Sequence, residues 1–226
     1  MKLPFDPVKN GWHFPENSIV GAMGVKRSNG LCGGMSLAAV NYFRYGMNIP
    51  AINSSDLKNA PNRTGTVQIN SHTHPVLDFI LYSQFAVFES LNIINQKAVL
   101  PFPNTPECHH LNSIDNEFPK IKKAIDNGCF VILGLRSLKE DYQGYHQTLV
   151  YGYDDKNYTL YMYDSNNPNE EVIAKSNGYR LVFSNGMQYS SYYLLMTLNP
   201  AIKSDLNAYD SSKNHVYNCA VKPPMA

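Results

Sequence analysis

The chain has 226 residues, of which 43% are hydrophobic and 12% aromatic, so one domain can bury a full core without disulfides or metal ions. Its 19 basic and 18 acidic residues give a formal charge of +1 and form no basic stripe, which argues against nucleic acid as a partner. The sequence has no stretch of about 20 apolar residues that would span a membrane and no N-terminal apolar run typical of a signal peptide. We therefore expect a soluble, single-domain protein over residues 1–226, cytoplasmic or exported without a leader.

Helical periodicity is confined to the first 128 residues. Apolar side chains recur there at steps of three and four residues in three segments, which predicts helices. The predicted helices cover residues 33–45, 75–95 and 119–128. Gly46 and Pro50 follow the first of them as a stop signal, and the segments 51–66 and 100–113, rich in proline and polar residues, are predicted as loops.

The apolar pattern changes to a period of two after residue 128, which predicts strands. The predicted strands cover residues 129–135, 146–154, 158–164, 179–184 and 187–198. Helices first and strands second indicate an α+β fold, in which a helical part over about 28–128 packs on an antiparallel sheet over about 129–198. A cleft is expected where the two parts meet, and residues 199–226 form a C-terminal extension.

Cys32 stands in the segment SNGLCGGMS, at the first turn of the first predicted helix. The unpaired N–H groups and the dipole of a helix N-terminus favour a thiolate, and the N–H of Cys32 itself could point at a developing oxyanion. Gly33 and Gly34 would let a substrate backbone approach closely and are candidate cleft residues. The alternative is a buried structural thiol, which is the commoner role of a single cysteine before a helix.

A base for such a thiol is available downstream. His146 begins one predicted strand, next to the candidate cleft residue Tyr145, and Asp164 ends the next strand. Two adjacent antiparallel strands place the start of the first beside the end of the second, so we expect the Asp164 carboxylate to orient the imidazole. Taken singly, His146 could be a satisfied core imidazole, and Asp164 a turn former in DSNNP.

Three motifs in this order, NGLCGGMS, HQTLVYGYD and LYMYDSNNP, resemble those of the papain-like cysteine peptidases, and are closest in style to bacterial peptidases of the bacteriocin-processing, C39-like type. The resemblance implies a papain-like fold whose central helix is headed by the nucleophilic Cys32, with His146 as general base and Asp164 holding its ring. Such peptidases usually carry a glutamine before the nucleophile as an oxyanion donor. Lys26 and Asn29 are the candidates for that role in this chain.

The predicted function is a cysteine hydrolase that cleaves a peptide or isopeptide bond of a peptide or protein substrate through a thioester, without a cofactor or metal ion. A deamidase or acyltransferase of the toxin or effector type would use the same triad. A non-catalytic papain-like module that binds a peptide in the cleft is the third alternative, and the absence of the glutamine motivates it.

The other histidines and cysteines give no recognisable site. The candidate metal ligands lie in two loop-like segments without the spacing of a zinc motif, so no metal site is predicted. These residues are His72, His74, Cys108, His109 and His110. Cys108 and Cys219 both lie in loop-like sequence and could form a disulfide, whereas Cys129 begins an apolar strand and is expected to be a buried small hydrophobe.

Overall fold

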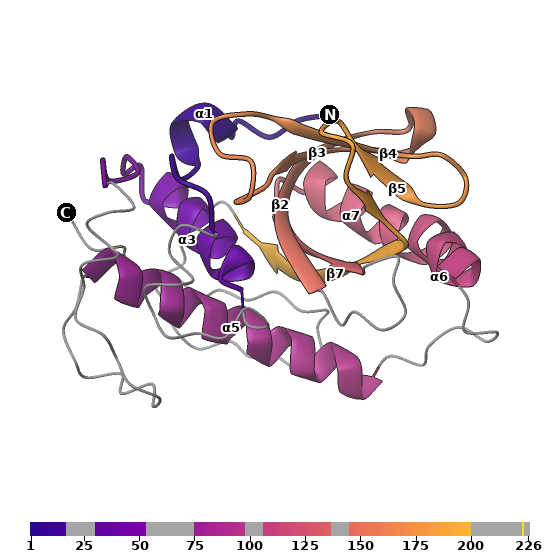
Figure 1. The fold of residues 1–226 in the computed structure, drawn as a ribbon, viewed down its shortest axis with the longest axis horizontal. Coiled ribbons are helices and arrows are strands. Elements are labelled where there is room, and N and C mark those ends of the chain that lie inside the picture. The colour runs from indigo at the N-terminus through magenta and orange to yellow at the C-terminus, as the bar shows by residue number, and fades with distance from the viewer. Residues whose placement is uncertain (17–29, 53–74, 98–105, 137–144, 200–222, 224–226) are drawn as a thin grey trace.

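The computed structural model describes residues 1–16, 30–52, 75–97, 106–136, 145–199 and 223 (Figure 1). Its helices are α1 (Pro7–Asn10), α3 (Cys32–Arg44), α5 (Pro75–Lys97), α6 (Pro106–Asn112) and α7 (Phe118–Asp126), with a π-helical segment at Ser113–Glu117 and a 3₁₀ turn at Lys156–Tyr158. The strands are β1 (Phe130–Arg136), β2 (Tyr145–Asp154), β3 (Thr159–Tyr163), β4 (Val172–Ser176), β5 (Leu181–Phe183), β6 (Gln188–Tyr189) and β7 (Ser191–Leu198).

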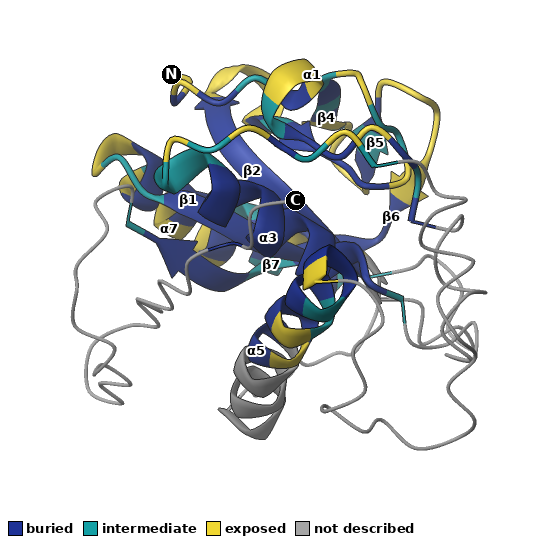
Figure 2. Ribbon diagram, turned by 90° about the vertical axis from the view of Figure 1, so that its left-hand side faces the viewer, coloured by how far each residue is buried: buried dark blue, intermediate teal, exposed yellow. Residues whose placement is uncertain are grey.

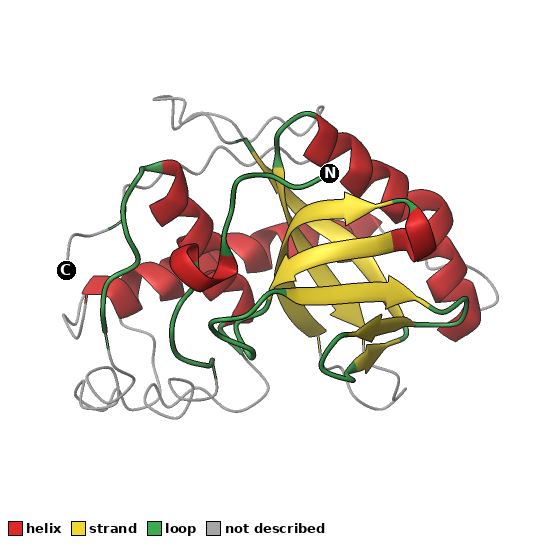
Figure 3. Cartoon of the chain, turned by 90° about the horizontal axis from the view of Figure 1, so that it is seen from above, coloured by secondary structure: helices red, strands yellow, loops and turns green. Residues whose placement is uncertain are grey.

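The described strands form one antiparallel sheet in the order β6-β5-β4-β3-β2-β1-β7, and the ribbon shows that it is strongly curled (Figures 1 and 3). In Figure 1, α3 and α5 lie to the left of and below β2, and α6 and α7 lie to its right. Helices packed on a largely antiparallel sheet confirm the predicted α+β class. Within the described ranges, no helix is long and apolar enough to cross a bilayer.

The three predicted helices form within two residues of their expected bounds, because each has an apolar face that the fold buries. In α5, Val76 and Ile80 are fully buried whereas Tyr82 and Phe85 are exposed. The helix α3 is different, since all of its first eleven residues are buried, the polar Ser36 and Asn41 among them (Figure 2). A helix buried on all sides sits at the centre of the molecule, which fixes the position of its N-terminus.

Several elements depart from the sequence prediction. The single strand predicted over 187–198 is divided at Ser190 into β6 and β7, which lie at opposite edges of the sheet, because each pairs with a different strand. Residues 106–112 form α6 and not a loop, because His109 and His110 are held against the sheet by Arg136 and Ser176, with N···N and N···O distances of 2.8 Å each. These are contacts across 27 and 66 residues, which local sequence does not reveal. The sequence pattern also does not predict the strand β4. It has only five residues, and it is held by pairing with both β3 and β5.

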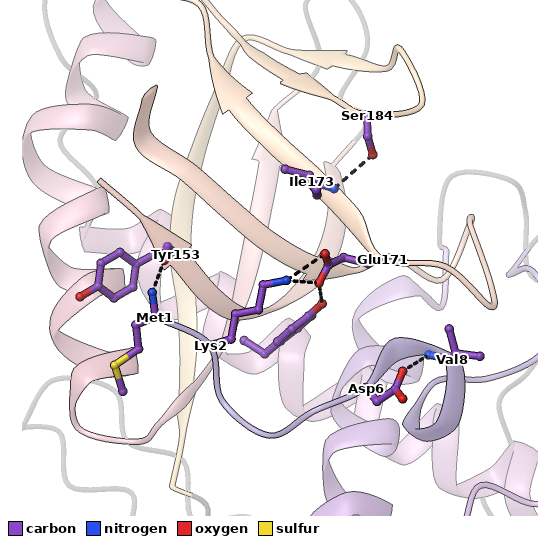
Figure 4. Close-up of polar contacts among 9 residues, drawn as sticks. Met1, Lys2, Asp6, Val8, Tyr153, Glu171, Ile173 and Ser184 are labelled. Carbon is purple, nitrogen blue, oxygen red and sulfur yellow. Dashed lines mark hydrogen bonds and ion pairs between the residues drawn. The ribbon is translucent and has the colours of Figure 1, made fainter. Parts of the chain in front are cut away.

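The N-terminal segment is tied to both halves of the molecule. Figure 4 shows the Met1 ammonium donating to the Tyr153 carbonyl oxygen of β2, at 2.6 Å, and the Lys2 Nζ paired with both oxygens of Glu171, at 2.7 and 2.9 Å. Farther along, the Trp12 Nε1 donates to the Met35 carbonyl oxygen of α3, at 3.0 Å. The segment therefore bridges sheet and central helix, and its last described residue, Glu16, lies at the start of α3.

Candidate active site

Cys32 is the first residue of α3, and its side chain is buried. The preceding residue, Leu31, gives the helix no side-chain cap, so the first backbone N–H groups depend on other partners. The Cys32 Sγ lies 3.9 Å from the Gln147 Oε1 of β2, at the long limit for a thiol hydrogen bond. The thiol thus sits where the central helix meets the second strand of the sheet.

The strand pairing brings His146 and Asp164 together, in the way that two adjacent antiparallel strands predict. His146 is the second residue of β2, and Asp164 directly follows β3, which pairs with β2 through Leu149 and Tyr163. The His146 Nε2 lies 2.7 Å from the Asp164 Oδ1, and both residues are buried. Because Nε2 faces the carboxylate, Nδ1 is the ring nitrogen left for a second partner.

The Asp164 carboxylate is held by the turn that follows it. Asn166 N donates to Oδ1 at 2.9 Å, and Asn167 Nδ2 donates to Oδ2 at 3.0 Å. The Asn167 N also donates to the Asp164 carbonyl oxygen, at 2.9 Å, which closes the turn. Asp164 is therefore both a turn former and the partner of His146, so the two interpretations of its motif are compatible.

The pKa values of the pair move apart. Burial lowers the pKa of His146, but the Asp164 charge, its hydrogen bond and the nearby Cys32 thiol outweigh burial and raise that pKa well above 6.5. Burial raises the pKa of Asp164, and the charge and hydrogen bond of His146, with the Asn166 and Asn167 donors, bring it below 3.8. Each group thus favours the charged form of the other. The ring of Tyr189 stacks on the imidazole of His146, with ring centroids 6.2 Å apart.

Glu16 is a member of the site that the sequence analysis missed. Its Oε1 accepts the N–H of Leu31, and its own N–H donates to the Ser165 carbonyl oxygen at 3.0 Å, so it joins the chain before Cys32 to the chain after Asp164. A carboxylate oxygen of Glu16, the Cys32 Sγ and a ring nitrogen of His146 all lie within 4.8 Å of one another. Nothing in the local sequence HFPENS marks this residue for the site.

Burial and neighbouring groups have opposite effects on the pKa of the Glu16 carboxyl group. Burial raises its pKa above 4.5, and the His146 charge and the backbone N–H groups of Leu31 and Cys32 oppose that rise. The same N–H groups are the donors that a helix N-terminus offers to an anion. Glu16 therefore occupies the anion position at the N-terminus of α3.

A pair of buried glutamines lies beside the thiol. Gln84 of α5 donates from Nε2 to the Gln147 Oε1 at 3.2 Å, and its own Oε1 accepts the N–H of Gly34 at 2.6 Å. The first turn of α3 thus has a polar partner from α5 as well as Glu16. Sequence periodicity placed Gln84 on a helix but gave no reason to link it to Cys32.

Gly33 and Gly34 are both buried against protein atoms, which accounts for the absence of a side chain at each position. A Cβ on Gly33 would lie 2.0 Å from the Gln147 Oε1, and one on Gly34 would lie 2.4 Å from the carbonyl oxygen of Ile80. The first contact is with a side chain that can move, and the second is with the backbone of α5. Close packing of α3 on its neighbours thus explains these glycines without a substrate.

We expect Gly34→Ala to lower the free energy of unfolding by about 1–3 kcal/mol, because α3 and α5 must separate to admit the methyl group. Gly33→Ala should cost less, since its Cβ would meet only side chains, those of Gln147 and Val87, and not backbone. Urea unfolding of the two variants measures the difference. Equal stability of wild type and Gly34→Ala would show that the two helices are not in the described contact.

Several predicted residues lie outside the part of the chain that the structure describes. These are the oxyanion candidates Lys26 and Asn29, and also His72, His74 and Cys219; the Cys108–Cys219 disulfide therefore stays a prediction. Tyr145 begins β2, but only its backbone is described. His109 and His110 hold α6 to the sheet, and neither belongs to the group around Cys32.

Comparison with known proteins gives one match. Residues 90–195 match the model of the Peptidase_C39 like family. That range contains His146 and Asp164, but it begins after Glu16 and Cys32 and does not include them. The searches of curated proteins and of solved structures found no match. The family match confirms the predicted resemblance to the C39-like cysteine peptidases, over the part of the chain that carries the histidine and the aspartate.

Proposed function

We propose that the protein is a cysteine hydrolase with a papain-like fold, which cleaves a peptide or isopeptide bond through a thioester. The supporting observation is the meeting of Cys32, at the head of a buried central helix, with the hydrogen-bonded pair of His146 and Asp164 on the sheet. These three residues come from separate parts of the chain, and the Cys-His-Asp order is the one the resemblance implies. The match to the C39-like family supports the same class of reaction.

In the proposed reaction, the Cys32 thiol gives its proton to the free Nδ1 of His146, and the sulfur attacks the substrate carbonyl carbon. The imidazolium then passes that proton to the leaving nitrogen, so the carbon–nitrogen bond breaks and a thioester remains on Cys32. Water, deprotonated by His146, attacks the thioester and releases the acid, and the proton returns to the sulfur. Asp164 keeps Nε2 protonated and the ring oriented throughout.

The oxyanion of the tetrahedral intermediate needs donors, and the N–H of Cys32 is the one nearest the reacting sulfur. Because the Glu16 carboxyl group accepts the adjacent N–H of Leu31 at the same helix terminus, the substrate oxygen has to lie beside this carboxyl group or displace it. Lys26 or Asn29 is proposed as the additional side-chain donor.

A peptide library digested with the protein tests the proposal by product mass. Hydrolysis gives new peptide termini, deamidation leaves the chain intact and exchanges an amide for a carboxyl group, and acyl transfer to an added amine gives an amide adduct. New termini that form with wild type and not with Cys32→Ala would support the hydrolase. Only deamidated or amine-coupled products would instead assign the same triad to those reactions, and no product of any kind would favour a peptide-binding module.

A further inference from the structure

The group around Cys32 offers three different metal donors at close range. Glu16 provides a carboxylate oxygen, Cys32 a sulfur and His146 a ring nitrogen, all within 4.8 Å of one another and all three residues buried. These are the donor types that zinc takes, and Zn–S and Zn–N bonds at a tetrahedral centre place the two donor atoms about 3.5 Å apart. The sulfur and the nitrogen therefore need to approach by about 1.3 Å at most to share one ion.

The outer contacts of the group also suit a metal ion. A metal-bound histidine usually gives its other ring N–H to a carboxylate, and the His146 Nε2 is already paired with Asp164 at 2.7 Å. The Glu16 carboxylate is held by the Leu31 N–H, which leaves its remaining lone pairs for an ion. Both ligands are thus oriented by partners that would not have to move.

Charge favours a divalent cation at this position. With the thiol deprotonated, Glu16, Cys32 and Asp164 would carry three negative charges against the single positive charge of His146 in a buried site, and an excess of buried charge is costly. Zn²⁺ would neutralise Glu16 and Cys32, while His146 would bind in its neutral form and Asp164 would remain its partner. A thiolate and an imidazole in the donor set favour zinc over magnesium or calcium, which prefer oxygen ligands.

We propose that Glu16, Cys32 and His146 bind one Zn²⁺ ion with a fourth position open, and that the bound ion blocks the thiol. The binding rests on the geometry of the three donors alone, and only the resulting inhibition rests on the proposed hydrolase function. Zinc would act as a reversible inhibitor, since the sulfur that it holds and the imidazole nitrogen that it occupies are the groups that the reaction uses.

The test is protection of Cys32 from iodoacetamide by Zn²⁺, read at the Cys32 peptide by mass spectrometry, together with zinc affinity from competition with a chromophoric chelator. Zinc should slow labelling of Cys32 at least about tenfold and leave labelling of Cys129 unchanged. Glu16→Gln should weaken zinc binding by at least about 10–100-fold, because that is the loss on removing an outer partner of a metal ligand and Glu16 is proposed as a ligand itself. Glu170→Gln, at an exposed carboxylate that is not part of the donor group, should bind zinc like wild type.

Equal zinc affinity in wild type and Glu16→Gln, or zinc binding without protection of Cys32, would overturn the proposal. Co²⁺ provides a second measurement that does not depend on the folding of Glu16→Gln. Wild type with Co²⁺ should show a thiolate-to-metal charge-transfer band that Cys32→Ala lacks, and absence of the band in wild type would also contradict the site. Neither readout uses a substrate, so both outcomes are independent of whether the protein hydrolyses peptides.

Discussion

Replacing Cys32 with alanine is expected to lower the turnover of a p-nitrophenyl acyl ester by about ten-thousand-fold. The sulfur is the protein group that bonds to the substrate in the proposed reaction, and removal of a nucleophile leaves little more than the contribution of binding and oxyanion donors. An activated ester is a suitable probe, because it reports acyl-enzyme formation without knowledge of the peptide sequence that the site prefers. Release of p-nitrophenol followed by absorbance gives the rate.

Cys129→Ala is the matched control for this prediction. Cys129 is partly exposed, and burial raises the pKa of its thiol against the opposing effect of Arg44, so it is a poor nucleophile. Its removal should leave the ester rate within about twofold of wild type. A Cys32→Ala variant that keeps a tenth or more of the wild-type rate would assign the chemistry to another group.

Asp164→Asn should have the second largest effect, on both rate and stability. The ester rate is expected to fall by about a thousandfold or more, because an amide can hold the ring of His146 in the wrong tautomer and does not stabilise its positive charge. Both partners of the pair are buried, and removing one charge from such a pair costs about 3 kcal/mol of unfolding free energy. Urea unfolding at several pH values measures this cost.

The pH dependence of that cost follows from the two pKa shifts. The raised pKa of His146 gives stability that is fully present below 6.5 and is lost as the pH rises through the folded value. The lowered pKa of Asp164 gives stability that is present above 3.8 and is lost as the pH falls through the folded value. The difference between wild type and Asp164→Asn should therefore be largest between 3.8 and 6.5 and shrink on either side.

Asp155→Asn is the control for the stability measurement, since Asp155 pairs with Lys122 at 2.7 Å on the surface. Exposed pairs contribute little to stability, so this variant should unfold close to wild type at every pH. A cost for Asp164→Asn that does not vary with pH would show that the loss comes from packing or from the turn, and not from the charged pair.

The sequence predicted those parts of the fold that depend on local pattern. The helices α3, α5 and α7 and the strands β1, β2 and β3 follow from a change of apolar period, because each buries one face or both. The nearness of His146 and Asp164 could also be expected, since antiparallel pairing of β2 with β3 fixes which ends of the two strands meet. Local pattern together with the antiparallel direction of the two strands thus accounts for the His146 and Asp164 half of the site.

Contacts between distant segments account for what could not be predicted. Glu16 reaches Cys32 only because the N-terminal segment is tied to Tyr153 on one side and to Met35 on the other. The sequence alone predicts room for a substrate at Gly33 and Gly34, and their crowding by Gln147 and α5 follows only from the packing of α3. The helix α6 could not be predicted for the same reason, since its histidines stabilise it through hydrogen bonds to Arg136 and Ser176, which are distant in the sequence.

The central claim is that His146 activates Cys32, and the rate of iodoacetamide labelling at Cys32 tests it most directly. The rate should be measured at mildly acidic pH in wild type and in His146→Ala, with Cys129 labelling in the same sample as the reference and with thermal unfolding to verify that the variant is folded. We predict that Cys32 in wild type reacts at least about tenfold faster than in His146→Ala, because the imidazolium stabilises the reactive thiolate. Equal labelling rates in the two folded proteins would contradict the account and leave Cys32 as a structural thiol.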